Sequence, residues 1–160
     1  MRVLFFLGLF IFLFAEGVSS QEIPVYSNFK KVEYLLHKDT DTTYVINFWA
    51  TWCAPCVKEM PAFNRLHEEF KNEPLDITLI SLDFGSSAVE RVKKFSEKHG
   101  IKSRIVILDD PDSNSWINKV SPEWSGALPG TLIYNQDFRK FYEKEFNYKE
   151  LYHIVKSKIK

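Results

Sequence analysis

The sequence is poor in several residue types that mark specialised classes of protein. Only two of its 160 residues are cysteine and six are glycine, which excludes a scaffold built on many disulfides and a collagen-like repeat. Neither sign of charge dominates, because 21 Lys and Arg balance 21 Asp and Glu. We therefore expect no broad basic surface and no nucleic-acid partner. Hydrophobic residues make up 45% of the chain, a share that indicates one folded domain with a packed core.

A long hydrophobic run is also missing. The apolar stretch at residues 3–14 has about a dozen positions, whereas a membrane-spanning helix needs roughly 20. Arg2 precedes this stretch and small residues follow it at 18–20, a pattern typical of a signal peptide that is cleaved after them. We therefore expect residues 1–20 to be a signal peptide, residues 21–160 to form the folded domain, and the protein to be exported to the periplasm. An uncleaved membrane anchor is the alternative.

Hydrophobic periodicity predicts alternating helices and strands in the rest of the chain. The expected helices are 27–38, 54–71, 87–99, 115–120 and 147–159, and the expected strands are 44–49, 76–82, 104–108, 131–134 and 138–146. Pro61 should kink the second helix, Gly100 should end the third, and Asn147 with Glu150 should cap the last. Strands separated by helices, followed by a hairpin and a final helix, imply an α/β fold with a mixed central sheet flanked by helices.

The candidate chemistry lies where the strand 44–49 ends and a helix begins, because Cys53 and Cys56 stand there in a C-x-x-C arrangement. A thiolate at Cys53 would accept hydrogen bonds from the unpaired N–H groups of the first helical turn and would gain from the helix dipole. A fall of its pKa from ~8.5 to ~7 would make about half of it thiolate at neutral pH. Cys53 is therefore the predicted nucleophile, and Cys56, one turn further on, the resolving thiol. Pro55 suits the first turn, where its missing N–H costs nothing.

Other uses of the cysteine pair fit the sequence less well. Haem attachment needs histidine directly after the second cysteine, where this chain has Val57. A purely structural disulfide would close a very short loop and stabilise little. Zinc would need two further ligands, and the histidines are scattered without paired spacing: His37, His67, His99 and His153. We therefore expect no metal and no cofactor.

The run from Asn47 to Pro61 resembles the active-site signature of a known family. Its centre reads Asn47-Phe48-Trp49-Ala50-Thr51-Trp52-Cys53-Ala54-Pro55-Cys56. This run is similar to that of the thioredoxin superfamily, and within it to the exported TlpA/ResA-like thiol-disulfide oxidoreductases. The resemblance covers the chain from about residue 27 to its end, and residues 87–108 resemble the helix-strand insertion of that branch. It implies a thioredoxin-like fold and a reductant that acts on disulfides of exported proteins and is itself reduced by a membrane electron donor.

The same resemblance assigns roles to residues outside the cysteine pair. The family places a cis-proline loop opposite the dithiol, and Leu128-Pro129 matches that loop. Asn47 stands where thioredoxins carry a buried Asp, so Glu59, one turn beyond the second cysteine, becomes the candidate for proton transfer. A solvated helix carboxylate is the other interpretation of Glu59. Substrate contacts are expected from Trp52, Ala54, Pro55, Leu128 and Pro129.

Two other functions stay open at this point. A thiol peroxidase of the peroxiredoxin type would carry the pattern P-x-x-x-T-x-x-C, but Ile46 and Ala50 occupy the positions of its Pro and Thr. A redox-inactive module of the same fold would instead hold peptides in a groove at residues 128–131. Thiol-disulfide exchange through Cys53 and Cys56 is the function that the sequence favours.

Overall fold

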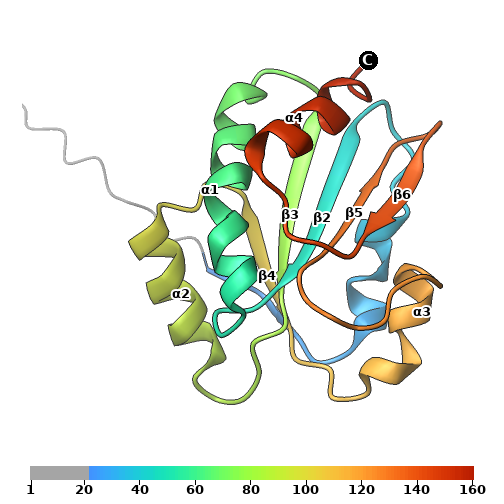
Figure 1. Ribbon diagram of the computed structural model, residues 1–160. Helices are drawn as coiled ribbons and strands as arrows, with labels where there is room; N and C mark the ends of the chain where they lie inside the picture. The colour runs from blue at the N-terminus through green and yellow to red at the C-terminus, as the bar shows by residue number, and fades with distance from the viewer. Residues whose placement is uncertain (1–21) are drawn as a thin grey trace, which may run out of the picture.

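The computed structural model describes residues 22–160, which form a six-stranded mixed sheet with helices on both faces (Figure 1). The expected signal peptide at 1–20 lies outside these residues. The strands are β1 (Val25–Tyr26), β2 (Thr43–Trp49), β3 (Leu75–Ser81), β4 (Arg104–Leu108), β5 (Gly130–Tyr134) and β6 (Arg139–Tyr142). The helices are α1 (Ala54–Glu69), α2 (Ala88–His99), α3 (Ile117–Val120) and α4 (Tyr148–Lys156), with short 3-10 helices η1 (Phe29–Lys31), η2 (Glu33–Leu36) and η3 (Ser113–Ser115). The predicted α/β class and the mixed, helix-flanked sheet are confirmed.

The strands lie in the order β1-β4-β3-β2-β5-β6. The first four in this order pair in parallel, while β5 and β6 run antiparallel to their neighbours. The predicted unit of α2 and β4 is present, and β4 widens the sheet between β1 and β3. Because β2 and β3 are parallel neighbours, their carboxyl ends meet at one edge of the sheet, where α/β proteins commonly place their sites.

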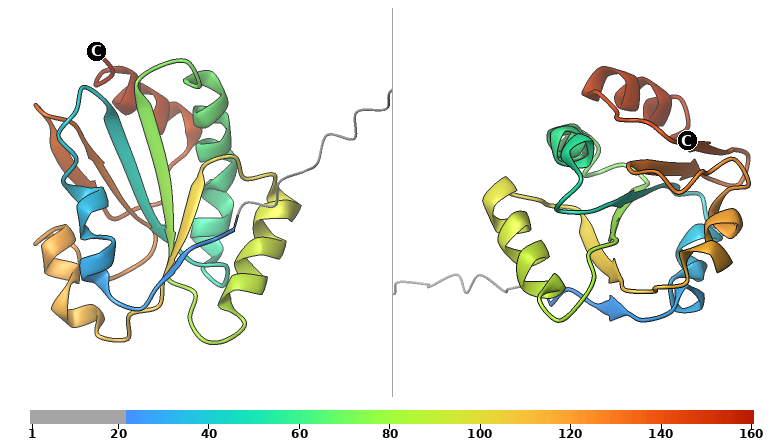
Figure 2. Two further views of the ribbon diagram at one scale, coloured as in Figure 1. Left: turned by 180° about the vertical axis from the view of Figure 1, so that it is seen from behind. Right: turned by 60° about the horizontal axis from the view of Figure 1, so that its bottom comes forward.

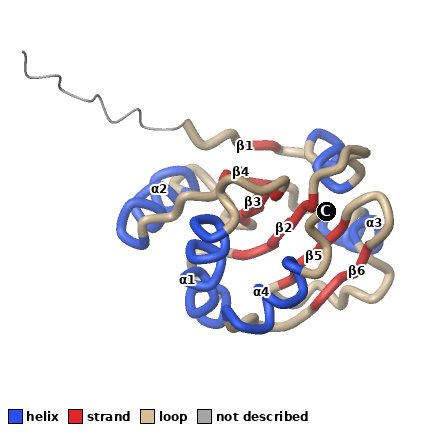
Figure 3. The backbone as a smooth tube through the Cα atoms, turned by 90° about the horizontal axis from the view of Figure 1, so that it is seen from above, coloured by secondary structure: helices blue, strands red, loops and turns tan. Residues whose placement is uncertain are grey.

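Two buried clusters lie on opposite faces of the sheet, and β2 contributes to both. Successive side chains of a strand point to opposite faces, so Val45 and Trp49 pack with α1, α2 and α4, while Ile46 and Phe48 pack with η1, η2 and α3. Figure 2 and Figure 3 show α1 and α4 on one face of the sheet and the short helices on the other. Every residue of β2 is buried, which explains why Asn47 is the one polar side chain between Tyr44 and Trp49 that needs buried hydrogen-bond partners.

The segment 27–38 does not form the single helix that its periodicity predicts. It folds as η1 and η2, with Asn28 capping the first of them. The N–H of Phe29 donates to the carboxylate of Asp110 at 2.8 Å, a contact between residues far apart in the sequence. The apolar side chains are nevertheless buried as expected, so the error concerns the backbone and not the face that packs.

Most other boundaries shift from the predictions by one or two residues, and three elements differ more. Strand β6 ends at Tyr142, because its partner β5 begins only at Gly130 and Tyr142 already pairs with Thr131. The expected helix 115–120 is divided into η3 and α3. Helix α4 ends at Lys156, short of 159, but the predicted cap is confirmed, since the Asn147 side chain accepts a hydrogen bond from the N–H of Glu150. Within residues 22–160, no helix has the length and apolar character needed to cross a membrane.

Candidate active site: a cysteine pair beside an apolar groove

Cys53 is the N-cap of α1, and its sulfur accepts a hydrogen bond of 3.3 Å from the N–H of Cys56. The two residues form a disulfide with their Cα atoms 5.2 Å apart. Cys53 is 7% exposed and Cys56 is completely buried, so the sulfur of Cys53 is the more accessible of the two. In the reduced protein the same N–H group and the positive end of α1 would stabilise a thiolate on Cys53.

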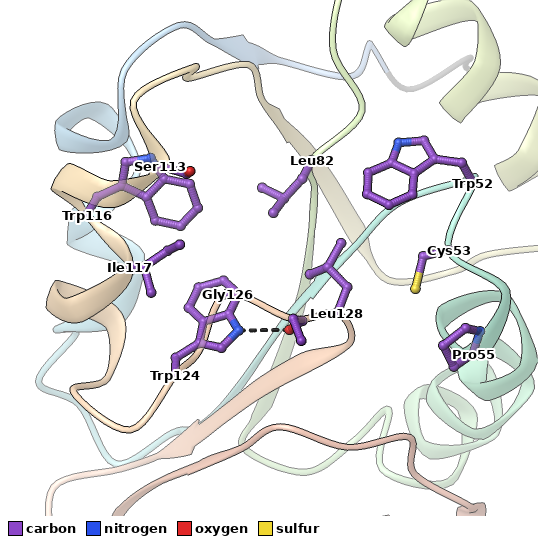
Figure 4. A pocket seen from close by; sticks show the side chains of 11 residues that line it. Trp52, Cys53, Pro55, Leu82, Ser113, Trp116, Ile117, Trp124, Gly126 and Leu128 are labelled. Atoms are coloured by element: carbon purple, nitrogen blue, oxygen red, sulfur yellow. Dashed lines mark hydrogen bonds between the residues drawn. The ribbon is translucent and has the colours of Figure 1, made fainter.

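A groove of about 470 Å³ opens directly beside Cys53 (Figure 4). Trp52 and Pro55 lie on the cysteine side of this groove, while Trp116 and Trp124 form its far wall. The indole N–H of Trp124 donates to the carbonyl of Ala127 at 2.8 Å, which fixes that wall. Because the lining is mainly aromatic and aliphatic, the groove can accept an apolar side chain next to the reactive sulfur.

The predicted cis-proline loop reaches this groove. The Leu128-Pro129 peptide bond is cis, and Leu128 lines the groove between its two walls. Pro129 is buried and Ala54 is exposed, and neither of them lines the groove. Trp52 is 61% exposed, so its indole is available to a partner. The structure thus brings Trp52, Pro55 and Leu128 together around Cys53.

Glu59, three residues after Cys56 in α1, is buried, with an exposure of 1%. Its carboxylate accepts hydrogen bonds of 2.9 Å from the amide of Asn47 and of 2.9 Å from the N–H of Phe146. Burial raises the pKa of Glu59 to about 7, although both hydrogen bonds act in the opposite direction. The interpretation as a solvated helix carboxylate is therefore wrong. Since Glu59 follows Cys56 by one helical turn, both side chains leave the same face of α1.

Sequence reasoning missed Asp83, whose carboxylate contacts the loop between β2 and α1. We call this loop, residues 50–53, the active-site loop. Asp83 is completely buried and accepts hydrogen bonds from both the N–H and the hydroxyl of Thr51. One signal was present: Asp83 follows the end of β3 at the sheet edge where β2 leads into the cysteine pair. No cluster of three or more His, Cys, Asp or Glu side chains that could hold a metal ion occurs within residues 22–160.

The model of the AhpC/TSA family matches residues 26–139. The thiol-disulfide oxidoreductase ResA of Bacillus anthracis is 39% identical over 92 residues, which are 58% of this chain and 48% of that protein. ResA of Geobacillus kaustophilus is 39% identical over 62 residues, which are 39% of this chain and 34% of the relative. The chain thus spans about half the length of these relatives, or less.

Solved structures show the same fold. A thioredoxin-related protein from Neisseria meningitidis serogroup B superposes with a TM-score of 0.63 at 27% identity, covering 76% of this chain and 87% of that one. A DsbF homologue from Corynebacterium diphtheriae superposes with a TM-score of 0.61 at 18% identity, covering 74% of this chain and 73% of that one. The expected thioredoxin-like fold is therefore confirmed.

Proposed function

This chain belongs to the AhpC/TSA family, and from that premise we propose that it is an exported thiol-disulfide oxidoreductase that reduces disulfides of envelope proteins. The observation that carries the proposal is the position of Cys53, whose sulfur caps α1 within disulfide distance of Cys56 and faces the apolar groove. The similarity to proteins named ResA supports the same activity. The apolar stretch at residues 3–14 supports export.

The reaction proceeds in two exchanges. The Cys53 thiolate attacks one sulfur of a partner disulfide, which breaks that bond, forms a mixed disulfide and releases the other partner sulfur as a thiolate that takes a proton from water. Cys56 then gives its proton to the Glu59 carboxylate and attacks the sulfur of Cys53. The partner leaves with both cysteines reduced, and two electrons have passed to it from Cys53 and Cys56. A pKa of about 7 allows Glu59 to accept this proton near neutral pH.

The groove determines which partners fit. An extended segment could pair with the backbone of Leu128 while an apolar side chain next to its cysteine enters the space between Trp52 and Trp124. The substrate class is therefore a flexible protein segment with a disulfide and a neighbouring apolar residue. A dithiol carrier in the membrane would return two electrons to the Cys53–Cys56 disulfide and complete the cycle.

Reduction of insulin disulfides by dithiothreitol tests this proposal. Wild-type protein should accelerate the reaction, whereas Cys53→Ser should not. Reduced Cys56→Ser, mixed with insulin after dithiothreitol has been removed, should accumulate a mixed disulfide because the resolving thiol is gone. Equal rates for wild type and Cys53→Ser would contradict the proposal and favour a peptide-binding module. Rapid consumption of hydrogen peroxide by the reduced protein, without insulin reduction, would favour a thiol peroxidase instead.

A further inference from the structure

Asp83 is fully buried, and its carboxylate takes no part in the two exchanges described above. It follows β3 and accepts hydrogen bonds from the N–H of Thr51 at 2.8 Å, from the Thr51 hydroxyl at 2.6 Å and from the Ser81 hydroxyl at 2.8 Å. Burying a carboxylate is costly unless it is paired and hydrogen-bonded. A buried carboxylate with this many donors is therefore expected where its hydrogen bonds hold the donating residues in place.

A cation from α2 pairs with this carboxylate. Nε of Arg91 lies 3.4 Å from an Asp83 oxygen, and the Arg91 side chain is 41% exposed. The same guanidinium donates to the carbonyl of Phe84 at 2.8 Å and to the hydroxyl of Ser87. Arg91 thus fixes the loop between β3 and α2, and through Asp83 it connects that loop to Thr51.

Thr51 connects the hydrogen bonds around Asp83 and Arg91 to the reactive cysteine. The loop from β2 to α1 has few residues, and Thr51 stands two positions before Cys53. The N–H of Cys53 donates to the carbonyl of Ala50 at 3.2 Å, and the carbonyl of Trp49 accepts from Leu82 at 2.8 Å. The hydrogen bonds to Asp83 therefore hold the middle of this loop, between the end of β2 and the cysteine that caps α1.

We propose that Asp83, paired with Arg91 of α2, is a positioning residue that fixes Thr51 and thereby aims the Cys53 sulfur and the Trp52 indole at the incoming disulfide. This inference rests on the proposed function, because it concerns the same site. The gain is in orientation, since a displacement of ~1 Å at a reacting group can cost up to about 100-fold in rate. Helix α2, which carries Arg91, then also supports the active-site loop that leads to Cys53.

A pair of matched substitutions separates positioning from simple stabilisation. Thr51→Val keeps the shape of the side chain but removes the hydroxyl that donates a hydrogen bond to Asp83, whereas Thr51→Ser keeps this hydroxyl. Thr43→Val is the control, because Thr43 is buried at the other end of β2 and donates its hydroxyl to the carbonyl of Lys158 at 2.9 Å. Each change is also made in a Cys56→Ser background, so that Cys53 is the single thiol. The rate constant for alkylation of Cys53 by iodoacetamide and the kcat/KM for insulin are then measured, together with urea unfolding.

Positioning predicts that Thr51→Val slows both reactions by about threefold to tenfold. Thr51→Ser should keep the wild-type rates, and Thr43→Val should leave both rates unchanged. All three variants should remain folded. Asp83→Asn, measured below its unfolding transition, should slow alkylation at least as much as Thr51→Val. Equal alkylation rates for wild type, Thr51→Val and folded Asp83→Asn would overturn the inference. Because alkylation does not require a protein substrate, a wild-type protein that fails to reduce insulin would contradict the proposed function and leave this test intact.

Discussion

The amide nitrogen of Asn47 lies 2.9 Å from one carboxylate oxygen of Glu59 and donates a hydrogen bond to it. The same nitrogen lies 3.0 Å from the hydroxyl of Thr131, so one side chain of β2 links the active-site helix to the strand that follows the cis-proline loop. Asn47 itself takes up no proton in the physiological range. Titration at this position therefore depends on Glu59, whose pKa burial raises to about 7.

Glu59→Gln should change the pH dependence of thiol exchange. Glutamine cannot accept the proton of Cys56, so resolution of the mixed disulfide should slow by about 100-fold or more at neutral pH. Its rate should also lose its dependence on pH near 7. The measurement is the rate of mixed-disulfide resolution between pH 5 and 9. Glu68→Gln, an exposed change on the same helix, is the control. Identical profiles for wild type and Glu59→Gln would exclude the proposed proton transfer.

The same substitution should flatten the dependence of stability on pH. The pKa of Glu59 is raised from 4.5 in the unfolded chain to about 7, so its contribution is fully present below about 4.5 and is lost as the pH rises through 7. Relative to Glu59→Gln, the wild-type free energy of unfolding should therefore be higher at pH 5 than at pH 8 by roughly 2 to 3 kcal/mol. Urea unfolding of both proteins at each pH measures this difference. A difference near zero would mean that the fold does not raise the pKa of Glu59.

Trp52→Ala should weaken substrate binding without weakening the fold. The side chain is 61% exposed, so the loss of stability should stay within about 0.5 kcal/mol. Its place on the rim of the groove predicts a fall of about 10-fold in kcat/KM for insulin, mostly through KM, because truncation of a contacting aromatic side chain commonly costs more than ~1 kcal/mol. Tyr34→Ala is the matched control, since Tyr34 is 51% exposed and does not line the groove. Equal losses in both variants would count against a contact with Trp52.

Gly130→Ala should destabilise the protein through the aromatic wall of the groove. A Cβ at Gly130 would lie 2.7 Å from the ring tip of Phe141 and 3.3 Å from the Trp124 ring. Overpacking of this kind costs about 1 to 3 kcal/mol. Urea unfolding measures the loss, and adding Phe141→Leu to Gly130→Ala should recover part of it because the ring tip is removed. If the second change only adds its own cost, the predicted clash is absent.

The elements around the cysteines could be predicted from the sequence because their signals are local. The apolar run of β2, the periodicity of α1 and the Leu128-Pro129 pair all lie within short windows. The resemblance to a known family added the cis bond and the candidate role of Glu59. Burial of Glu59 could not be predicted, because it depends on Phe146, a residue far along the chain whose N–H donates to the carboxylate.

Elements that long-range contacts create were missed. Strand β1 has two residues and no periodicity of its own, and it is defined by the pairing of Val25 with Ile107. The partnership of Asp83 with Thr51 likewise joins two loops whose neighbourhood follows only from the parallel pairing of β2 and β3. Sequence patterns report which face of an element is buried, but they do not report which distant polar group completes a hydrogen bond.

The pH dependence of Cys53 alkylation in the single variant Cys56→Ser tests the central claim most directly. If the N-terminus of α1 stabilises the thiolate, the rate should rise with a midpoint well below the ~8.5 of an unperturbed cysteine. A midpoint at ~8.5, with the rate constant of free cysteine, would contradict the account, because Cys53 would then have no more nucleophilic thiolate than any exposed cysteine.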